Sequence, residues 1–278
     1  MSFTFSVPTA PRLGLADVLA AGAPGVRSAE EVPPSGWPDG YVHIWLPDVS
    51  TRGVELSADG GELDVRLLTC SAREEYELGV ALAAAAARLS GTRVRSEDGW
   101  ELAPAELPGR FGPAWAAQQA DAGPGVAMLL AGERGPLSMS GPVRDFHVGP
   151  RLAGELAAAG PEAELPARFL AAMRRAQWPG ERYYAASTYQ LSGKRSGATV
   201  TFAVWSGVAT VIPDVELVML HASRDQPPLA VPRPAVPSIA GRYGAWLDEV
   251  QLLLEEVPAD DWSTVLAAAA PHQAHLPD

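Results

Sequence analysis

The sequence predicts an α+β fold in which mainly antiparallel β-sheets pack against helices. Two hairpins are indicated. Alternating residues 54–69 flank an Asp-Gly pair suited to a tight turn, and strand-like runs within 182–207 flank the polar loop "SGKRSG". Apolar residues recur at helical spacing over 72–89 and 239–257. These strands and helices together define the fold class.

The domain organisation follows from the order of these elements. Each long helix follows a group of strands, over residues 41–89 and 183–257. Two similar β-β-β-α halves are one interpretation of this order, although no similarity between their residues requires it. The 278 residues can bury a sizeable core, and a composition of 47% hydrophobic and 19% charged residues is typical of globular proteins. We predict a single α+β domain over residues 1–278, with a subdivision into 1–165 and 166–278 as the alternative.

Local patterns predict the remaining elements. Alternating or β-branched runs indicate strands, spacings of three and four indicate helices, and Pro/Gly-rich stretches indicate connections. Strands are expected at residues 2–8, 41–47, 92–101 (ending in a turn), 126–132, 136–141, 143–149, 208–212 and 215–222. Helices are expected at residues 13–21, 105–121, 151–159, 166–177 and 262–270, and long connections at 22–40 and 225–237.

The charge balance restricts the classes of partner. The formal net charge is −12 and the pI is about 4.9. Nucleic acids and anionic membrane surfaces attract concentrated positive charge, so neither is an expected partner. A basic protein would be attracted over long range, mainly through a faster association rate.

Features of the chain as a whole indicate its compartment. One cysteine cannot form an internal disulfide, the N-terminus lacks the pattern of a signal peptide, and the most apolar windows are too short to span a bilayer. Lysine occurs once, at Lys194, and asparagine is absent, which is typical of high-GC codon usage. We therefore expect a bacterial, cytoplasmic protein.

The single cysteine lies in "TCSAREEY". Residues 71–74, Ser-Ala-Arg-Glu, match the S-x-x-E capping box, in which Ser71 and Glu74 would satisfy the first amides of the helix. Cys70 would then directly precede the cap, where the helix dipole favours a thiolate. A cysteine nucleophile also needs a base, and His147 in "DFHVG" is the candidate. The alternative is a buried, inert thiol.

Motifs for metals and cofactors are incomplete. His272 and His275 have a metal-like i, i+3 spacing, but a zinc site needs three or four ligands. The loop "SGKRSG" does not match a P-loop and joins two strands instead of a strand and a helix. We predict no metal site and no cofactor.

Carboxylates cluster around tryptophan at two places. In "SEDGWE", Glu97, Asp98 and Glu101 surround Trp100; in "PADDW", two aspartates precede Trp262. A solvated turn with its tryptophan folded into the core explains this pattern without a function. The alternative is a binding patch, in which Trp100 supplies contact area and the carboxylates select a basic partner.

These observations favour a non-enzymatic, acidic protein that works by protein–protein interaction with a basic partner. Immunity proteins that neutralise basic toxin domains share this general profile. One alternative is a small-molecule enzyme or ligand-binding protein with a site between the two halves. Another is a structural or assembly subunit, which would form a large homo-oligomer. The sequence leaves the oligomeric state open.

Overall fold

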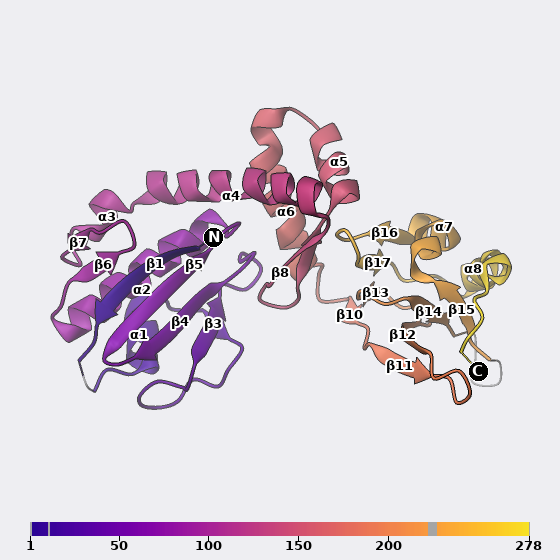
Figure 1. Cartoon of the computed structure of the whole chain (residues 1–278), viewed down its shortest axis with the longest axis horizontal. Coiled ribbons are helices and arrows are strands. Elements are labelled where there is room, and N and C mark those ends of the chain that lie inside the picture. The colour runs from indigo at the N-terminus through magenta and orange to yellow at the C-terminus, as the bar shows by residue number, and fades with distance from the viewer. Residues whose placement is uncertain (1, 11, 222–226, 278) are drawn as a thin grey trace. The chain divides into compact units, whose positions relative to one another are not determined.

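The computed structural model describes residues 2–10, 12–221 and 227–277, and these form two compact units (Figure 1). The N-terminal unit spans Met1–Trp178 and the C-terminal unit spans Pro179–Asp278. Each unit has its own hydrophobic core. The end of the predicted strand 215–222 and the start of the predicted connection 225–237 lie outside the described residues.

The N-terminal unit is built on an antiparallel seven-stranded sheet. Its strand order is β2 (Arg27–Ser28), β3 (Tyr41–Trp45), β4 (Val54–Asp59), β5 (Glu62–Leu68), β1 (Ser2–Pro8), β6 (Val94–Ser96) and β7 (Glu101–Leu102). The predicted β4–β5 hairpin is confirmed: Gly60 and Gly61 form its turn with φ of +57° and +82°. Glycine, which lacks a Cβ, tolerates these angles, so local sequence determines the turn.

Helices α1 (Leu15–Gly22) and α2 (Arg73–Ser90) cover one face of this sheet and lie behind the strands in Figure 1. The predicted helix 72–89 is confirmed as α2, and its many alanines allow close packing on several sides. A Cβ at Gly79 would overlap the Leu67 side chain of β5, so glycine is required where α2 approaches the sheet.

The predicted strand at 126–132 is wrong, because these residues belong to helix α4 (Pro113–Arg134), which follows α3 (Leu107–Arg110). A short apolar run does not distinguish a buried strand from a helix. The deciding feature is a stripe of small buried residues at spacings of three and four, which is the helical period. It consists of Ala116, Ala120, Pro124, Ala127 and Ala131.

The rest of the N-terminal unit matches the predicted order. A two-stranded sheet pairs β8 (Leu137–Met139) with β9 (Phe146–Val148). Helix α5 (Pro150–Ala158), the short helix η1 (Glu162–Glu164) and helix α6 (Leu165–Gln177) follow. Phe146 and Phe169 bring β9 and α6 together with ring centroids 5.7 Å apart, and both rings are fully buried.

The C-terminal unit, as far as it is described, contains two four-stranded sheets. One has the order β10 (Tyr184–Ala185), β13 (Thr210–Ile212), β17 (Leu252–Leu254) and β16 (Gly244–Trp246). The other has the order β11 (Tyr189–Ser192), β12 (Thr199–Trp205), β14 (Leu217–Leu220) and β15 (Leu229–Pro232). The predicted hairpin around "SGKRSG" is confirmed as β11–β12. The first of its two predicted strands, however, is split into two. Residues 184–185 form β10 of the other sheet, and only β11 pairs with β12.

The predicted long helix at 239–257 is wrong. The chain forms α7 (Val236–Ala240) and a single 3-10 turn, η3 (Gly241–Tyr243), and then the strands β16 and β17. Gly241 has a φ of +56°, which ends the helix. The buried carboxylate of Asp248 accepts hydrogen bonds from the amides of Val250 and Gln251, at 2.9 and 2.7 Å, and so closes the turn between the strands. The second β-β-β-α half is therefore not formed.

The α+β class is confirmed, with mainly antiparallel pairing and parallel pairs at β10–β13 and β12–β14. In the C-terminal core, Trp205 of β12 packs edge-on against Trp262 of helix α8 (Ala259–Ala269), at 4.9 Å between ring centroids. The short helices η2 (Arg233–Ala235) and η4 (Ala270–His272) flank this core. No helix within the described ranges is both long and apolar enough to cross a bilayer.

Candidate functional site

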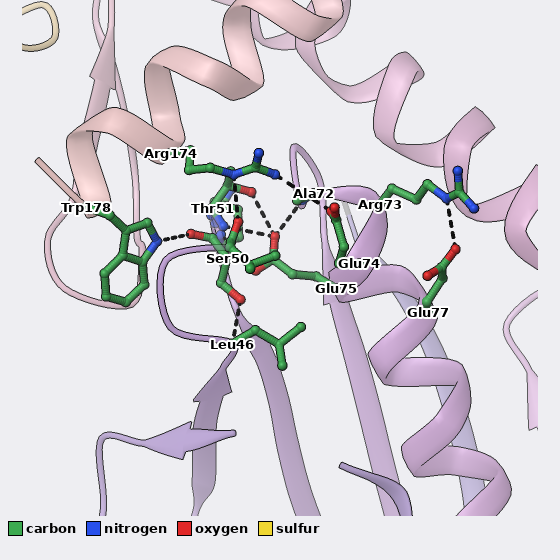
Figure 2. Close-up of polar contacts among 12 residues, drawn as sticks. Leu46, Ser50, Thr51, Ala72, Arg73, Glu74, Glu75, Glu77, Arg174 and Trp178 are labelled. Carbon is green, nitrogen blue, oxygen red and sulfur yellow. Dashed lines mark hydrogen bonds and ion pairs between the residues drawn. The ribbon is translucent and has the colours of Figure 1, made fainter. Parts of the chain in front are cut away.

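A buried carboxylate organises the N-terminal end of α2 (Figure 2). Glu75 is fully buried, and its oxygens accept hydrogen bonds from the amide and hydroxyl of Thr51, at 3.0 and 2.8 Å, and from the amide of Arg52 at 3.0 Å. The amides of Gly53 and Ala72 donate to it as well. A buried carboxylate is tolerated only when its oxygens are hydrogen-bonded, and here donors from two segments converge on it.

The predicted capping box lies one residue too early. The N-cap is Ala72 and the glutamate that reaches back to it is Glu75, whereas Ser71 and Glu74 were expected in these roles. Cys70 accounts for this one-residue shift. It has a φ of +66° and lengthens the turn after β5, so that Cys70 lies two residues before the N-cap instead of one. The Ser71 hydroxyl is buried without a hydrogen-bond partner in the described structure.

Burial controls the protonation of both central groups. It raises the pKa of Cys70 to about 12, and the nearby Arg52 guanidinium lowers it only in part. Burial also raises the pKa of Glu75, and the hydrogen bonds from Thr51, Ala72 and Gly53 oppose that shift. The cysteine therefore remains a protonated thiol at neutral pH, whereas a nucleophile must be a thiolate.

The two residues of the predicted nucleophile–base pair lie in different elements. Cys70 lies in the turn between β5 and α2, and a Cβ at Gly123 of α4 would come within 2.7 Å of its backbone nitrogen. His147 lies in β9, where its cross-strand partner is Ser138 of β8. Catalysis by Cys70 and His147 stays a prediction, and thiolate formation at Cys70 would have to overcome its burial.

The loop between β3 and β4 is fixed from the side of α6 as well (Figure 2). The indole nitrogen of Trp178 donates to the carbonyl of Ser50 at 2.7 Å, and Nε of Arg174 donates to the carbonyl of Val49 at 3.0 Å. The Ser50 hydroxyl accepts from the amide of Leu46 at 2.9 Å. The hydrogen bonds from α6 and its C-terminal end, together with those to Glu75, therefore hold the loop of residues 46–53 in one conformation between α2 and α6.

The face of the N-terminal sheet opposite α2 is polar, and we call it the open face. Alternate residues of each strand point to it, whereas their neighbours are buried against the helices. Cross-strand pairing arranges these residues in rows, in which Tyr41, Ser57, Asp64, Ser6 and Arg95 form one row. A second row is formed by His43, Glu55, Arg66 and Thr4.

Carboxylates outnumber guanidinium groups on the open face. The pairing places Glu55, Asp59, Glu62, Asp64 and Glu101 on this face, together with Arg27, Arg66 and Arg95. Glu55 and Arg66 form an ion pair at 2.7 Å, Arg95 pairs with Glu62, and the Ser6 hydroxyl donates to Asp64 at 2.6 Å. A hollow of about 430 Å³ lies over the two rows, lined by Thr4, Tyr41, Glu55, Ser57, Asp64 and Arg66. Tyr41 at its rim is 61% exposed.

The predicted patch around Trp100 lies in the turn between β6 and β7, at one side of the same sheet. Trp100 is 44% exposed, and the Arg110 guanidinium stacks 4.4 Å from its ring centroid. Asp98 is exposed, whereas Glu97 accepts from the Thr4 amide at 2.9 Å and Glu101 lies 3.6 Å from Arg93. Arginines thus partly neutralise the patch.

The second acidic cluster serves the C-terminal fold. Asp261 accepts hydrogen bonds from the Tyr243 hydroxyl and from Arg242, and these bonds lower the pKa of Asp261. His272 lies in η4 and His275 in the exposed tail. In the described ranges, no group of three or more His, Cys, Asp or Glu side chains is placed to hold a metal ion.

Sequence reasoning missed Glu75 and the open face for different reasons. Glu75 could have been considered, since it is the second glutamate of "SAREE". The S-x-x-E pattern that begins at Ser71 instead indicated its neighbour Glu74 as the capping glutamate. The alternation in residues 2–8 and 54–68 predicted strands with one polar side. It did not reveal that β1 lies between β5 and β6, which brings those polar sides together. Family models, curated proteins and solved structures contain no match to this chain.

Proposed function

We propose that this chain is a binding protein that acts through protein–protein contacts, and that its open face receives a basic partner. The observation that supports this proposal is the excess of carboxylates on a sheet face opposite the packed helices, in a chain of net charge −12. Complementary charge accelerates association and selects against acidic competitors.

The open face has features that are common in protein interfaces. Tyr41 is an exposed aromatic side chain beside the hollow, and tyrosine is enriched among residues that dominate binding energy. Asp64 lines the hollow and has no ion pair within the described residues, so a lysine or arginine side chain of the partner could reach its carboxylate. Trp100 adds a second exposed aromatic group at the side of the sheet.

An immunity-type role is the specific form of this proposal. In that role the chain would occupy the basic surface of a toxin domain and block it. The acidic charge and the rigid scaffold support the idea, since the buried Glu75 cluster fixes the loop that leads from β3 to β4. A rigid surface loses little conformational entropy on binding.

A labelled peptide provides the test. Fluorescein-labelled octa-arginine is titrated with the full chain at two salt concentrations, with fluorescence anisotropy as the readout and octa-glutamate as the opposite-charge control. The double variant Asp59→Asn/Asp64→Asn removes two open-face charges that no arginine pairs with in the described structure. Asp121→Asn/Glu133→Gln removes two exposed charges of α4 and serves as the matched control.

We expect the open-face variant to bind octa-arginine about fivefold more weakly, because an exposed charge pair contributes roughly 0.5 kcal/mol and the loss of two amounts to about 1 kcal/mol. The α4 variant should bind like the unmodified chain. Equal losses of affinity in both variants would mean that only the net charge attracts the peptide. That result would contradict the proposal that the open face is the binding site.

A further inference from the structure

A groove runs along one side of α2, on the helix-covered side of the sheet and therefore apart from the open face. Its volume is about 400 Å³, within the range of roughly 300–1,000 Å³ that is usual for small-molecule sites. Its floor is one stripe of α2, and its walls are the end of α1 and the segment 104–113. The stripe consists of Glu77, Val80, Ala81, Ala84 and Arg88.

The body of the groove is apolar. Val80 and Ala84 form the floor at successive turns of the helix, and the small alanine side chains keep that floor low. Phe111, which is almost fully buried, forms part of the opposite wall together with three prolines, Pro104, Pro108 and Pro113. An elongated apolar group would therefore be removed from water on more than one side.

The two ends of the groove differ in charge. Glu77 is already paired, because its carboxylate accepts from Nε of Arg73 at 2.8 Å. Arg88 is exposed, and its guanidinium has no ion pair or side-chain hydrogen bond within the described structure. Arg88 lies eleven positions after Glu77, or about 16 Å along the helix axis. The groove thus combines an apolar body with an available cation at one end.

We propose that this groove binds a small amphiphile with an anionic head, of the class of medium-chain carboxylates. The apolar chain lies on Val80 and Ala84 against Phe111, and the carboxylate meets the Arg88 guanidinium, which matches its fork-like geometry. The net charge of −12 does not prevent this, because charges beyond about 8 Å are screened at physiological ionic strength. The proposal stands independently of binding at the open face.

Isothermal titration calorimetry on the full chain with three ten-carbon probes tests the proposal. Decanoate carries the anionic head, decyltrimethylammonium the cationic head, and decanol is neutral, all used below the concentrations at which they self-associate. We expect saturable one-site binding of decanoate, weaker binding of decanol, and the weakest binding of the cation. Equal affinity for all three, or no saturable binding of decanoate, would overturn the proposal.

Two variants identify the site. Arg88→Gln should weaken decanoate binding about tenfold and leave decanol unchanged, because only the charged hydrogen bonds are lost. Arg134→Gln is the matched control, since Arg134 is an exposed arginine in the last turn of α4 as Arg88 is in α2. Equal effects of the two variants would contradict the assignment of the head group to Arg88. Ala81→Phe, at a partly exposed position of the floor, should weaken decanoate and decanol alike.

Discussion

Thr51 and Glu75, 24 residues apart, are joined twice: the amide and the hydroxyl of the threonine both donate to the same carboxylate oxygen, at 3.0 and 2.8 Å. Both residues are fully buried. The pair ties the loop after β3 to the first turn of α2, and therefore couples the sheet to the helix that covers it. Because a buried carboxylate without partners is costly, the fold depends on all of its donors.

Glu75→Gln should destabilise the chain by about 3 kcal/mol, because the amide group presents N–H donors to backbone N–H donors. Urea unfolding followed by circular dichroism measures the change. Glu74→Gln is the control: Glu74 is exposed, with Arg174 at 3.7 Å, and an exposed pair contributes at most about 1 kcal/mol. A loss at Glu75 as small as that at Glu74 would contradict the role assigned to the buried carboxylate.

Cys70 should resist alkylation in the folded chain. Iodoacetamide reacts with thiolate, and burial both hides the thiol and raises its pKa to about 12. Labelling at pH 8, followed by mass spectrometry, should therefore proceed only at the rate of unfolding. Rapid labelling of the folded chain with a midpoint below about 8.5 would instead restore the nucleophile hypothesis.

The same thiol makes stability depend on pH in alkaline solution. Because burial raises the folded-state pKa of this thiol above the ordinary value of a free thiol, the folded chain retains a proton that the unfolded chain releases. Its contribution to stability is fully present below pH 9 and is lost as the pH rises from 9 towards 12. The free energy of unfolding of the unmodified chain should fall more steeply over this range than that of Cys70→Ala. Parallel curves would contradict the raised pKa.

Gly79→Ala should destabilise the chain although alanine is the better helix former. The new methyl group would overlap Leu67, and overpacking a core costs roughly 1–3 kcal/mol, more than the ~1 kcal/mol gained in helix propensity. Gly125→Ala in α4 is the control, because the methyl group would meet no atom within 4 Å apart from its chain neighbours and its own helix backbone. That variant should be stabilised by about 0.5–1 kcal/mol. Thermal unfolding distinguishes the two; stabilisation of both would contradict the close packing of α2 on β5.

Asp248→Ala tests the strands that replace the expected helix at 239–257. The variant removes the acceptor of two backbone amides, which should cost about 2–4 kcal/mol. In a helix the same change would be neutral or stabilising, because alanine has the higher helix propensity. Glu256→Ala, at an exposed position nearby, should change stability by less than about 0.5 kcal/mol. A neutral Asp248→Ala would contradict the β16–β17 turn.

Local determinants explain which elements could be predicted. The β4–β5 turn depends on two adjacent glycines, and α2 on a long run of apolar residues, so both were predicted from their own segments. The segment 239–257 has apolar spacings that suit a helix, but Gly241 and the carboxylate of Asp248 impose a bend and a tight turn. Spacing alone carries no information about such hydrogen bonds.

Long-range pairing explains what could not be predicted at the candidate sites. Ser6 and Asp64 meet only because β1 inserts between β5 and β6, and residues 58 positions apart leave no common local pattern. The capping box was displaced because Cys70 has a positive φ in the turn after β5. Gly123 of α4 packs closely against the backbone of this turn. The polar character of each strand was visible in the sequence, whereas the surface that the strands share was not.

The central claim is that the open face binds a basic partner, and chemical-shift mapping tests it most directly. Amide resonances of the ¹⁵N-labelled full chain are recorded as unlabelled octa-arginine is added. We predict perturbations concentrated on the rows that contain Tyr41, Glu55 and Asp64, diminishing as salt is raised. Perturbations spread evenly over acidic positions of both units, or confined to positions away from β3, β4 and β5, would contradict the claim.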